Sequence, residues 1–204
     1  MCADTPGNRV PRFDPLPERE WDDLLKAVAA STGPLNIFTT LARHPALFHS
    51  WIGFGSMLLM KGTLSARDRE LAILRTAHHR SCAYEWDHHR GLALAAGLTE
   101  SEIAALRLDP DAHGWSDDDL MVLTTADELH ARGTVSDATW TELSTRFGER
   151  ELIELVILIG HYHMVAFALN ALRVQNEGPV PDEGHAETEE SARNEQRVQK
   201  LEEH

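Results

Sequence analysis

The sequence is poor in cysteine, in positive charge and in strand-like patterns. Only two cysteines occur among 204 residues, which excludes a disulfide framework and favours a reducing cytoplasm. Lys and Arg number 19 against 33 Asp and Glu, for a formal charge of −14. This excess of negative charge argues against nucleic acid and anionic membrane surfaces as partners. No segment alternates polar and apolar residues with a period of two, so we expect an all-α protein.

Composition divides the chain into an arm, one helical domain and a tail. Residues 1–15 are rich in Pro, Gly and polar groups without the apolar run of a signal peptide, which predicts a disordered arm. Residues 16–174 are long enough for one domain with a well-populated core. Residues 175–204 change to Gly, Pro and charge, which predicts an acidic, largely disordered tail.

Apolar residues recur at helical spacing through the central domain, and turn-forming residues separate the runs. Thr99 with Glu102 has the spacing of a capping box, and Ser136 is placed to cap another helix. Two helices are expected between Arg67 and Gly97, joined by a turn near Arg80 and Ser81. The pattern predicts the remaining helices over residues 16–30, 36–43, 45–60, from 99, 117–130, 136–147 and 151–174.

The last of these segments, residues 151–174, is apolar enough to raise the question of a membrane span. Glu154, His161, His163 and Asn170 interrupt it, and it has no suitable basic flanks. Polar groups of this kind are rare in lipid. We therefore expect a buried core helix that also forms a subunit contact.

Three chemically reactive side chains share one face of the helix after Ser81. Cys82, Glu85 and His89 lie at i, i+3 and i+7, so they project from the same side. Ser81 is the expected N-cap, which would place Cys82 in the first turn, where free N–H groups and the helix dipole favour a thiolate. The alternative is that Cys82 is a small core residue.

Glu70 belongs to the preceding helix and is followed at helical spacing by apolar residues. A desolvated carboxylate has a raised pKa unless it finds a partner. His89 would be that partner if the two helices pack as a hairpin. A structural ion pair with Arg75 or Arg90 is the alternative.

The pattern E-x11-C-x2-E-x3-H, formed by Glu70, Cys82, Glu85 and His89, resembles the carboxymuconolactone decarboxylase and alkylhydroperoxidase D superfamily. Its peroxidase branch has a second Cys where this chain has Glu85, and its decarboxylase branch keeps the E-x3-H element without the Cys pair. This chain departs from both and resembles a subgroup with C-x-Y-E-W-x-x-H. Segments 36–59 and 151–174 resemble the helices that open and close the family domain.

The resemblance implies a single-domain helical bundle that assembles as a homo-oligomer, either a trimer or a hexamer. It also implies that Glu70, Cys82, Glu85 and His89 are catalytic, in a protein that needs no cofactor. Three functions stay open. The first is acid–base chemistry of the decarboxylase, lyase or isomerase type on a small carbonyl, lactone or acid. The second is a single-Cys thiol peroxidase, and the third is a non-catalytic oligomeric ligand-binding protein.

Other polar residues have weaker patterns. Tyr84 and Trp86 should point away from the Cys82 face, with Trp86 in packing and Tyr84 as a candidate substrate-binding residue. His161 and His163 are further candidates for substrate binding, or else core and interface histidines. No metal site is expected, because none of the grouped histidines shows the i, i+4 spacing of a helical zinc site; the residues concerned are His78, His79, His88 and His89.

Overall fold

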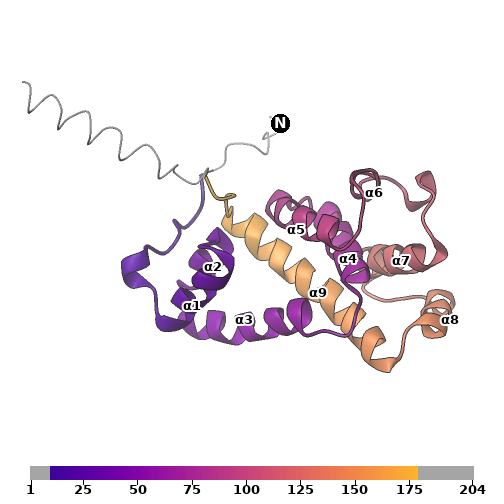
Figure 1. The fold of residues 1–204 in the computed structure, drawn as a ribbon, viewed down its shortest axis with the longest axis horizontal. Coiled ribbons are helices and arrows are strands. Elements are labelled where there is room, and N and C mark those ends of the chain that lie inside the picture. The colour runs from indigo at the N-terminus through magenta and orange to yellow at the C-terminus, as the bar shows by residue number, and fades with distance from the viewer. Residues whose placement is uncertain (1–9, 179–204) are drawn as a thin grey trace, which may run out of the picture.

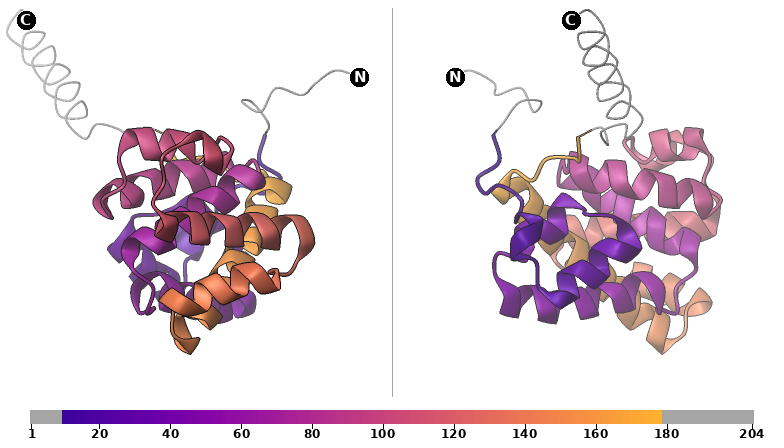
Figure 2. Two further views of the ribbon diagram at one scale, coloured as in Figure 1. Left: turned by 90° about the vertical axis from the view of Figure 1, so that its right-hand side faces the viewer. Right: turned by 60° about the vertical axis from the view of Figure 1, so that its left-hand side comes forward.

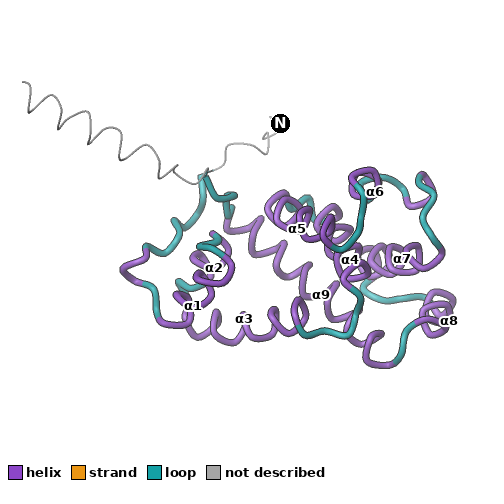
Figure 3. Tube along the Cα trace, viewed as in Figure 1, coloured by secondary structure: helices purple, strands orange, loops and turns teal. Residues whose placement is uncertain are grey.

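The computed structural model describes residues 10–178, and within this range the chain forms nine α-helices, two short 3-10 helices and no strand (Figures 1 and 3). The all-α prediction is confirmed. The helices are α1 (Asp23–Thr32), α2 (Asn36–Leu41), α3 (Pro45–Met60), α4 (Ala66–His79), α5 (Ala83–Ala95), α6 (Glu100–Ala105), α7 (Asp117–Arg132), α8 (Asp137–Arg146) and α9 (Glu149–Leu172), with 3-10 helices at Glu18–Glu20 and Pro110–Ala112.

Helix α9 runs through the middle of the molecule, with α1–α3 on one side and α4–α8 on the other (Figure 1). It contacts α3, α4, α5, α7 and α8. By length and hydropathy α9 is the one described helix that could cross a membrane, but half of its most apolar window is buried inside the protein. The apolar residues that this helix buries are Leu152, Leu155, Leu158, Ile159, Val165, Ala166 and Leu169. The expectation of a core helix is therefore confirmed.

The polar position Glu154 in α9 has a structural use. Its carboxylate accepts hydrogen bonds from the Thr63 amide at 2.6 Å, the Thr63 hydroxyl at 2.8 Å and the Leu64 amide at 3.2 Å. These bonds fix the loop that leads into α4. A Cβ on Gly62 would lie 2.0 Å from a Glu154 oxygen, so the loop needs glycine there.

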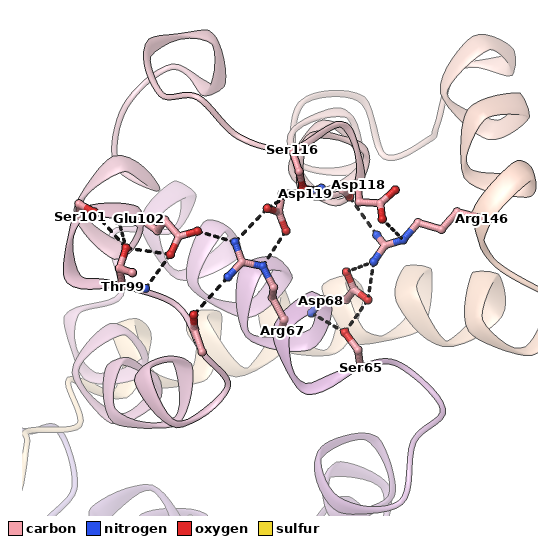
Figure 4. Close-up of polar contacts among 11 residues, drawn as sticks. Ser65, Arg67, Asp68, Thr99, Ser101, Glu102, Ser116, Asp118, Asp119 and Arg146 are labelled. Atoms are coloured by element: carbon pink, nitrogen blue, oxygen red, sulfur yellow. Dashed lines mark hydrogen bonds and ion pairs between the residues drawn. The ribbon is translucent and has the colours of Figure 1, made fainter.

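The first turn of α4 is held by two ion-pair networks that connect it to three other helices (Figure 4). Arg67 pairs with Glu102 of α6 at 2.5 Å and with Asp119 of α7 at 2.9 Å. Asp68 pairs with Arg146 of α8 at 2.8 Å. A charged group is buried at a large cost unless it is paired and hydrogen-bonded, and these carboxylates have both kinds of partner. The networks thereby fix the start of the helix that carries Glu70.

Several helix ends follow the sequence closely. Thr99 and Glu102 form the predicted capping box, and Ser136 caps α8 by accepting from the Thr139 amide. The first predicted helix is wrong at its start: residues 16–22 form a 3-10 turn and loop, and α1 begins at Asp23 behind an Asp22 cap. Asp22 caps by accepting from the Leu25 amide, and this bond fixes where the helix starts.

Ordered structure extends beyond both boundaries set from composition. The Arg12 amide donates to the Leu172 carbonyl at 3.0 Å, so the N-terminal segment lies against the end of α9 (Figure 2). At the other end, residues 174–178 pack against α2 and α5, with Glu177 contacting both. The remainder of the predicted arm and tail, residues 1–9 and 179–204, lies outside the described range.

Candidate functional site

The candidate site begins at the turn between α4 and α5. The predicted turn is confirmed: Arg80 ends α4, and Ser81 adopts a left-handed conformation with φ of 49°. The Cys82 amide then donates to the Ala77 carbonyl at 2.9 Å, and Asn170 of α9 donates to the Arg80 carbonyl at 2.8 Å. These bonds satisfy carbonyl groups at the end of α4 and attach the turn to α9.

Cys82 itself is the N-cap of α5, with an extended backbone. The prediction that Ser81 caps this helix is therefore wrong. The expectation that Tyr84 points away from Cys82 is also wrong, because both side chains lie in one apolar cluster with Ile37 and Leu169. An extended N-cap projects its side chain in a direction that helical periodicity does not describe. Trp86 does pack in the main core, as predicted.

The Cys82 thiol is not poised as a thiolate. Burial raises its pKa to about 12, with a further contribution from the negative charge of Glu85. The Glu85 backbone N–H lowers the pKa, but by less than these two effects raise it. The prediction that the helix N-terminus favours a thiolate here is wrong, because desolvation outweighs the backbone donors.

Glu70 and His89 form a buried pair across the α4–α5 interface. His89 Nδ1 lies 2.8 Å from Glu70 Oε2, and the Glu70 side chain is fully buried. Arg69 Nε donates to the other Glu70 oxygen at 3.1 Å. With the Glu70 carboxylate as acceptor, Nδ1 carries the imidazole proton and Nε2 is left as the basic nitrogen. The predicted hairpin contact is thus present.

The alternative partners proposed for Glu70 are engaged elsewhere. Arg75 pairs with Asp127 at 2.6 Å, and Arg90 pairs with Glu100. Glu70 therefore contacts Arg69 and His89 instead of either predicted arginine.

Glu85 is buried in a different manner from Glu70. Its side chain lies in the core at 2% exposure, and neither carboxylate oxygen has a hydrogen-bond partner within residues 10–178. Burial raises its pKa well above the ordinary value. Desolvation without a partner favours the protonated, neutral acid. Such a group is uncommon in folded proteins and marks a candidate functional position.

Tyr162 of α9 connects these groups. Its ring meets the His89 ring edge to face, with centroids 5.0 Å apart. Burial raises its pKa, and the negative charges of Glu70 and Glu85 raise it further. Tyr162 is not among the site residues predicted from the sequence. Its signal was helical spacing, because Tyr162 continues the buried stripe that includes Leu158 and Ile159.

The histidines on either side of Tyr162 make their own contacts, although the His161 ring also meets the Tyr162 ring edge to face, with centroids 5.4 Å apart. His161 stacks on Trp51 of α3, and desolvation lowers its pKa to about 4. His163 contacts His130 of α7 at 3.2 Å. Neither forms a hydrogen bond with Glu70, Cys82, Glu85 or His89, so their predicted role in substrate binding stays a prediction.

Comparison with known proteins gives a family match over part of the chain and a similar fold over most of it. Residues 45–117, which contain α3 to α6, match the Carboxymuconolactone decarboxylase family. The fold is similar to an alkylhydroperoxidase AhpD core, peroxidase-related protein from Ralstonia eutropha JMP134, with a TM-score of 0.73, 17% identity and coverage of 84% of this chain and 94% of that one. The family match covers residues 45–117, and the structural likeness extends the shared fold over most of the chain.

Two further solved structures have a similar fold. One is a peroxidase-related protein from Silicibacter sp. TM1040, with a TM-score of 0.69, 15% identity and coverage of 82% of this chain and 90% of that one. The other is the debrominase Bmp8 in complex with 2,3,4-tribromopyrrole, with a TM-score of 0.66, 15% identity and coverage of 81% and 91%. No curated protein matches the chain. At these identities the likeness shows the fold alone.

The residues that match the family model include Glu70, Cys82, Glu85 and His89, whereas Tyr162 lies beyond them. Across residues 10–178, no group of three or more His, Cys, Asp or Glu side chains is arranged to hold a metal ion. Three of the predicted non-ligands have carboxylate partners: His79 contacts Asp127, His88 contacts Glu177 and His89 contacts Glu70. The predictions of no metal and no cofactor stay predictions.

Proposed function

We propose that this protein is an acid–base enzyme of the decarboxylase, lyase or isomerase type, acting on a small carbonyl, lactone or acid without a cofactor. The observation that carries the proposal is that two buried acids on neighbouring helices, Glu70 of α4 and Glu85 of α5, differ in their partners. Glu70 is paired with His89 and Arg69, whereas Glu85 has no partner among the described residues. Burial raises the pKa of Glu85, and a buried carboxyl group with a raised pKa is characteristic of acid–base sites.

In this scheme His89 Nε2 takes a proton from carbon or oxygen of the substrate, and Glu70 holds the imidazole in the required tautomer. Glu85, which burial keeps protonated, returns a proton to the product. A decarboxylation breaks a carbon–carbon bond, releases CO2 and needs one proton at the carbon that remains, which Glu85 can supply. Groups tuned in this way typically contribute ~10²–10⁴-fold each. Tyr162 positions His89 through their ring contact.

Cys82 assists this chemistry or packs beside it. A thiol with a pKa of about 12 has roughly one molecule in 10⁵ ionised at pH 7. Thiol peroxidase chemistry needs the thiolate, so the buried thiol favours the acid–base alternative. The peroxidase alternative keeps the support of the peroxidase-related neighbours. A non-catalytic ligand-binding protein is the remaining alternative.

One assay panel separates these functions. Purified protein is incubated with carboxymuconolactone, with acetoacetate, and with tert-butyl hydroperoxide plus dithiothreitol, and each is repeated with Cys82→Ser and His89→Asn. The proposal expects turnover of a carbonyl probe that needs His89 and survives Cys82→Ser. Hydroperoxide reduction lost in Cys82→Ser would support the peroxidase instead. No turnover of any probe, with both variants only less heat-stable, would support the ligand-binding protein.

We also propose a homo-oligomer, trimeric or hexameric as the family resemblance implies. The support is an exposed apolar stripe on α9 at helical spacing, formed by Ile153, Ile157, Met164 and Phe167. Apolar stripes of this kind on a surface helix are typical of subunit contacts. The small-molecule substrate, the lack of nucleic-acid and membrane partners and the cytoplasmic location stay predictions.

A further inference from the structure

The carboxylate of Glu177 occupies a compact set of donors on the outer side of the Cys82 cluster. Its Oε1 accepts from the Asn36 amide at 2.6 Å and from the Tyr84 hydroxyl at 2.7 Å, and its Oε2 lies 2.7 Å from His88 Nε2. Burial raises the pKa of Glu177, but the Asn36 and Tyr84 donors outweigh it and the net shift is downward. The carboxylate is therefore bound in its charged form.

Two of these donors are held in place independently of Glu177. The Tyr84 and His88 rings stack with centroids 4.0 Å apart, and His88 Nδ1 lies 2.8 Å from the Tyr84 carbonyl. Both His88 nitrogens therefore face oxygen acceptors, and each contact is a hydrogen bond only where that nitrogen carries a proton. Tyr84 also lies in the buried cluster of Cys82. The side-chain part of the site is thus built into α5 and does not depend on the segment that fills it.

Glu177 belongs to a short segment, residues 174–178, which we call the strap. The Gln175 carbonyl accepts from the Asn36 side chain at 3.0 Å, and Asn176 donates to Asp87 at 2.6 Å. Val174 packs against the cluster that contains Cys82. Through these contacts the strap joins α2 to α5 and covers the side of the molecule on which the thiol lies.

We propose that Tyr84, His88 and the Asn36 amide form a carboxylate-binding site, which Glu177 fills as a tethered ligand, and that a small monocarboxylate displaces Glu177 and releases the strap from Cys82. The inference goes beyond the proposed function and rests on different residues from the Glu70–His89 pair. A tethered group competes at an effective concentration of about millimolar or more. Free carboxylate should therefore bind weakly to the wild type and much better once Glu177 loses its charge.

The test is a titration of the full chain with propionate, followed by NMR at the Asn36 amide. Glu177→Gln should bind propionate at least tenfold more tightly than the wild type. Glu100→Gln is the matched control, because it removes the same charge from an exposed position. Adding Tyr84→Phe and His88→Asn to Glu177→Gln should abolish the gain. Equal affinity in the Glu177→Gln and Glu100→Gln proteins, or a gain that survives loss of Tyr84 and His88, would overturn the proposal.

A second measurement needs no change at Glu177. In a Cys2→Ser background Cys82 is the remaining thiol, and its alkylation by iodoacetamide can be timed with and without propionate. Release of the strap predicts a several-fold faster reaction with propionate present than with an equal concentration of chloride. An unchanged rate would contradict the release. Neither measurement depends on turnover, so the outcome is separate from that of the proposed enzyme.

Discussion

His89 Nδ1 and Glu70 Oε2 lie 2.8 Å apart, and the carboxylate side of this contact has no exposure to solvent. The contact crosses from α5 to α4, so it can form only when the two helices pack as a hairpin. A buried carboxylate that holds an imidazole fixes which nitrogen is basic. The pair therefore leaves Nε2 as the His89 nitrogen that can accept a proton from a bound group.

The first prediction concerns Glu85 and pH. Its pKa is raised in the folded protein. At a pH above the pKa that Glu85 has in the unfolded chain, the unfolded chain therefore binds fewer protons than the folded protein. The free energy of unfolding should then fall as pH rises from about 5 toward the folded pKa, by at most about 1.4 kcal/mol per pH unit. Glu85→Gln keeps the shape of the neutral acid and should remove that decline.

Urea unfolding of the wild type and Glu85→Gln at pH 5, 6, 7 and 8 measures this difference. Glu100→Gln serves as the control, since this carboxylate is exposed and paired with Arg90. A wild-type slope that Glu85→Gln leaves unchanged would show that Glu85 is ionised in the folded protein.

The second prediction concerns the thiol. In a Cys2→Ser background, ultraviolet absorbance of the thiolate should show Cys82 ionising near pH 12, or only on unfolding. Glu85→Gln should lower that pKa, because the Glu85 charge is the second cause of its elevation. A thiol that titrates below pH 8 would instead favour the peroxidase alternative.

The third prediction concerns the turn at Ser81. In the left-handed region, a residue with a side chain lowers the stability of the folded state by about 1–2 kcal/mol relative to glycine. Glycine keeps only part of this advantage, because it has more conformational freedom to lose from the unfolded chain. Ser81→Gly should therefore stabilise the protein by about 0.5–1 kcal/mol, and Ser81→Val should destabilise it. Ser144→Gly, in the regular helix α8, should destabilise by about 0.5–1 kcal/mol. Thermal unfolding compares the three, and a loss of stability in Ser81→Gly would contradict the account of the turn.

The fourth prediction concerns assembly. Ile153→Glu with Ile157→Glu should convert the oligomer into monomers of 22.8 kDa, because both side chains lie on the exposed stripe of α9 and unpaired charges are costly in an apolar contact. Leu108→Glu is the control, as it is exposed away from α9. Light scattering after size-exclusion chromatography gives the mass. A monomeric wild type would rule out the proposed assembly at the concentration used.

The helices could be predicted because their signals are local. The Thr99–Glu102 capping box and the Ser136 cap depend on residues three apart, and the apolar spacing of residues 151–174 marks a core helix by itself. The start of α1 could not be predicted as well, because apolar spacing begins near Leu16 but the Asp22 side chain caps the helix later. The contacts of Glu177 with Tyr84 and His88 depend on tertiary packing, which composition does not report.

The site was predictable where it depended on helical periodicity. Glu70 and His89 could be paired because the apolar stripe and the turn near Ser81 implied a hairpin. The position of the Cys82 side chain could not be predicted, because Cys82 is an extended N-cap and does not follow the helical pattern. The raised pKa of the Cys82 thiol could not be predicted either, because the residues that bury the thiol include Ile37 and Leu169, which lie far away in the sequence. The contact of Tyr162 with His89 could not be predicted, because it depends on how α9 packs against α5.

The most direct test of the account is the turnover of the carbonyl probes by Glu70→Gln, His89→Asn, the double variant and Cys82→Ser. If Glu70 acts through His89, both single variants and the double variant should lose a similar factor of about 10²–10⁴, since residues that act as one unit are not additive. Cys82→Ser should keep most of the activity. Additive losses for Glu70 and His89, or full inactivation by Cys82→Ser alone, would contradict the acid–base mechanism.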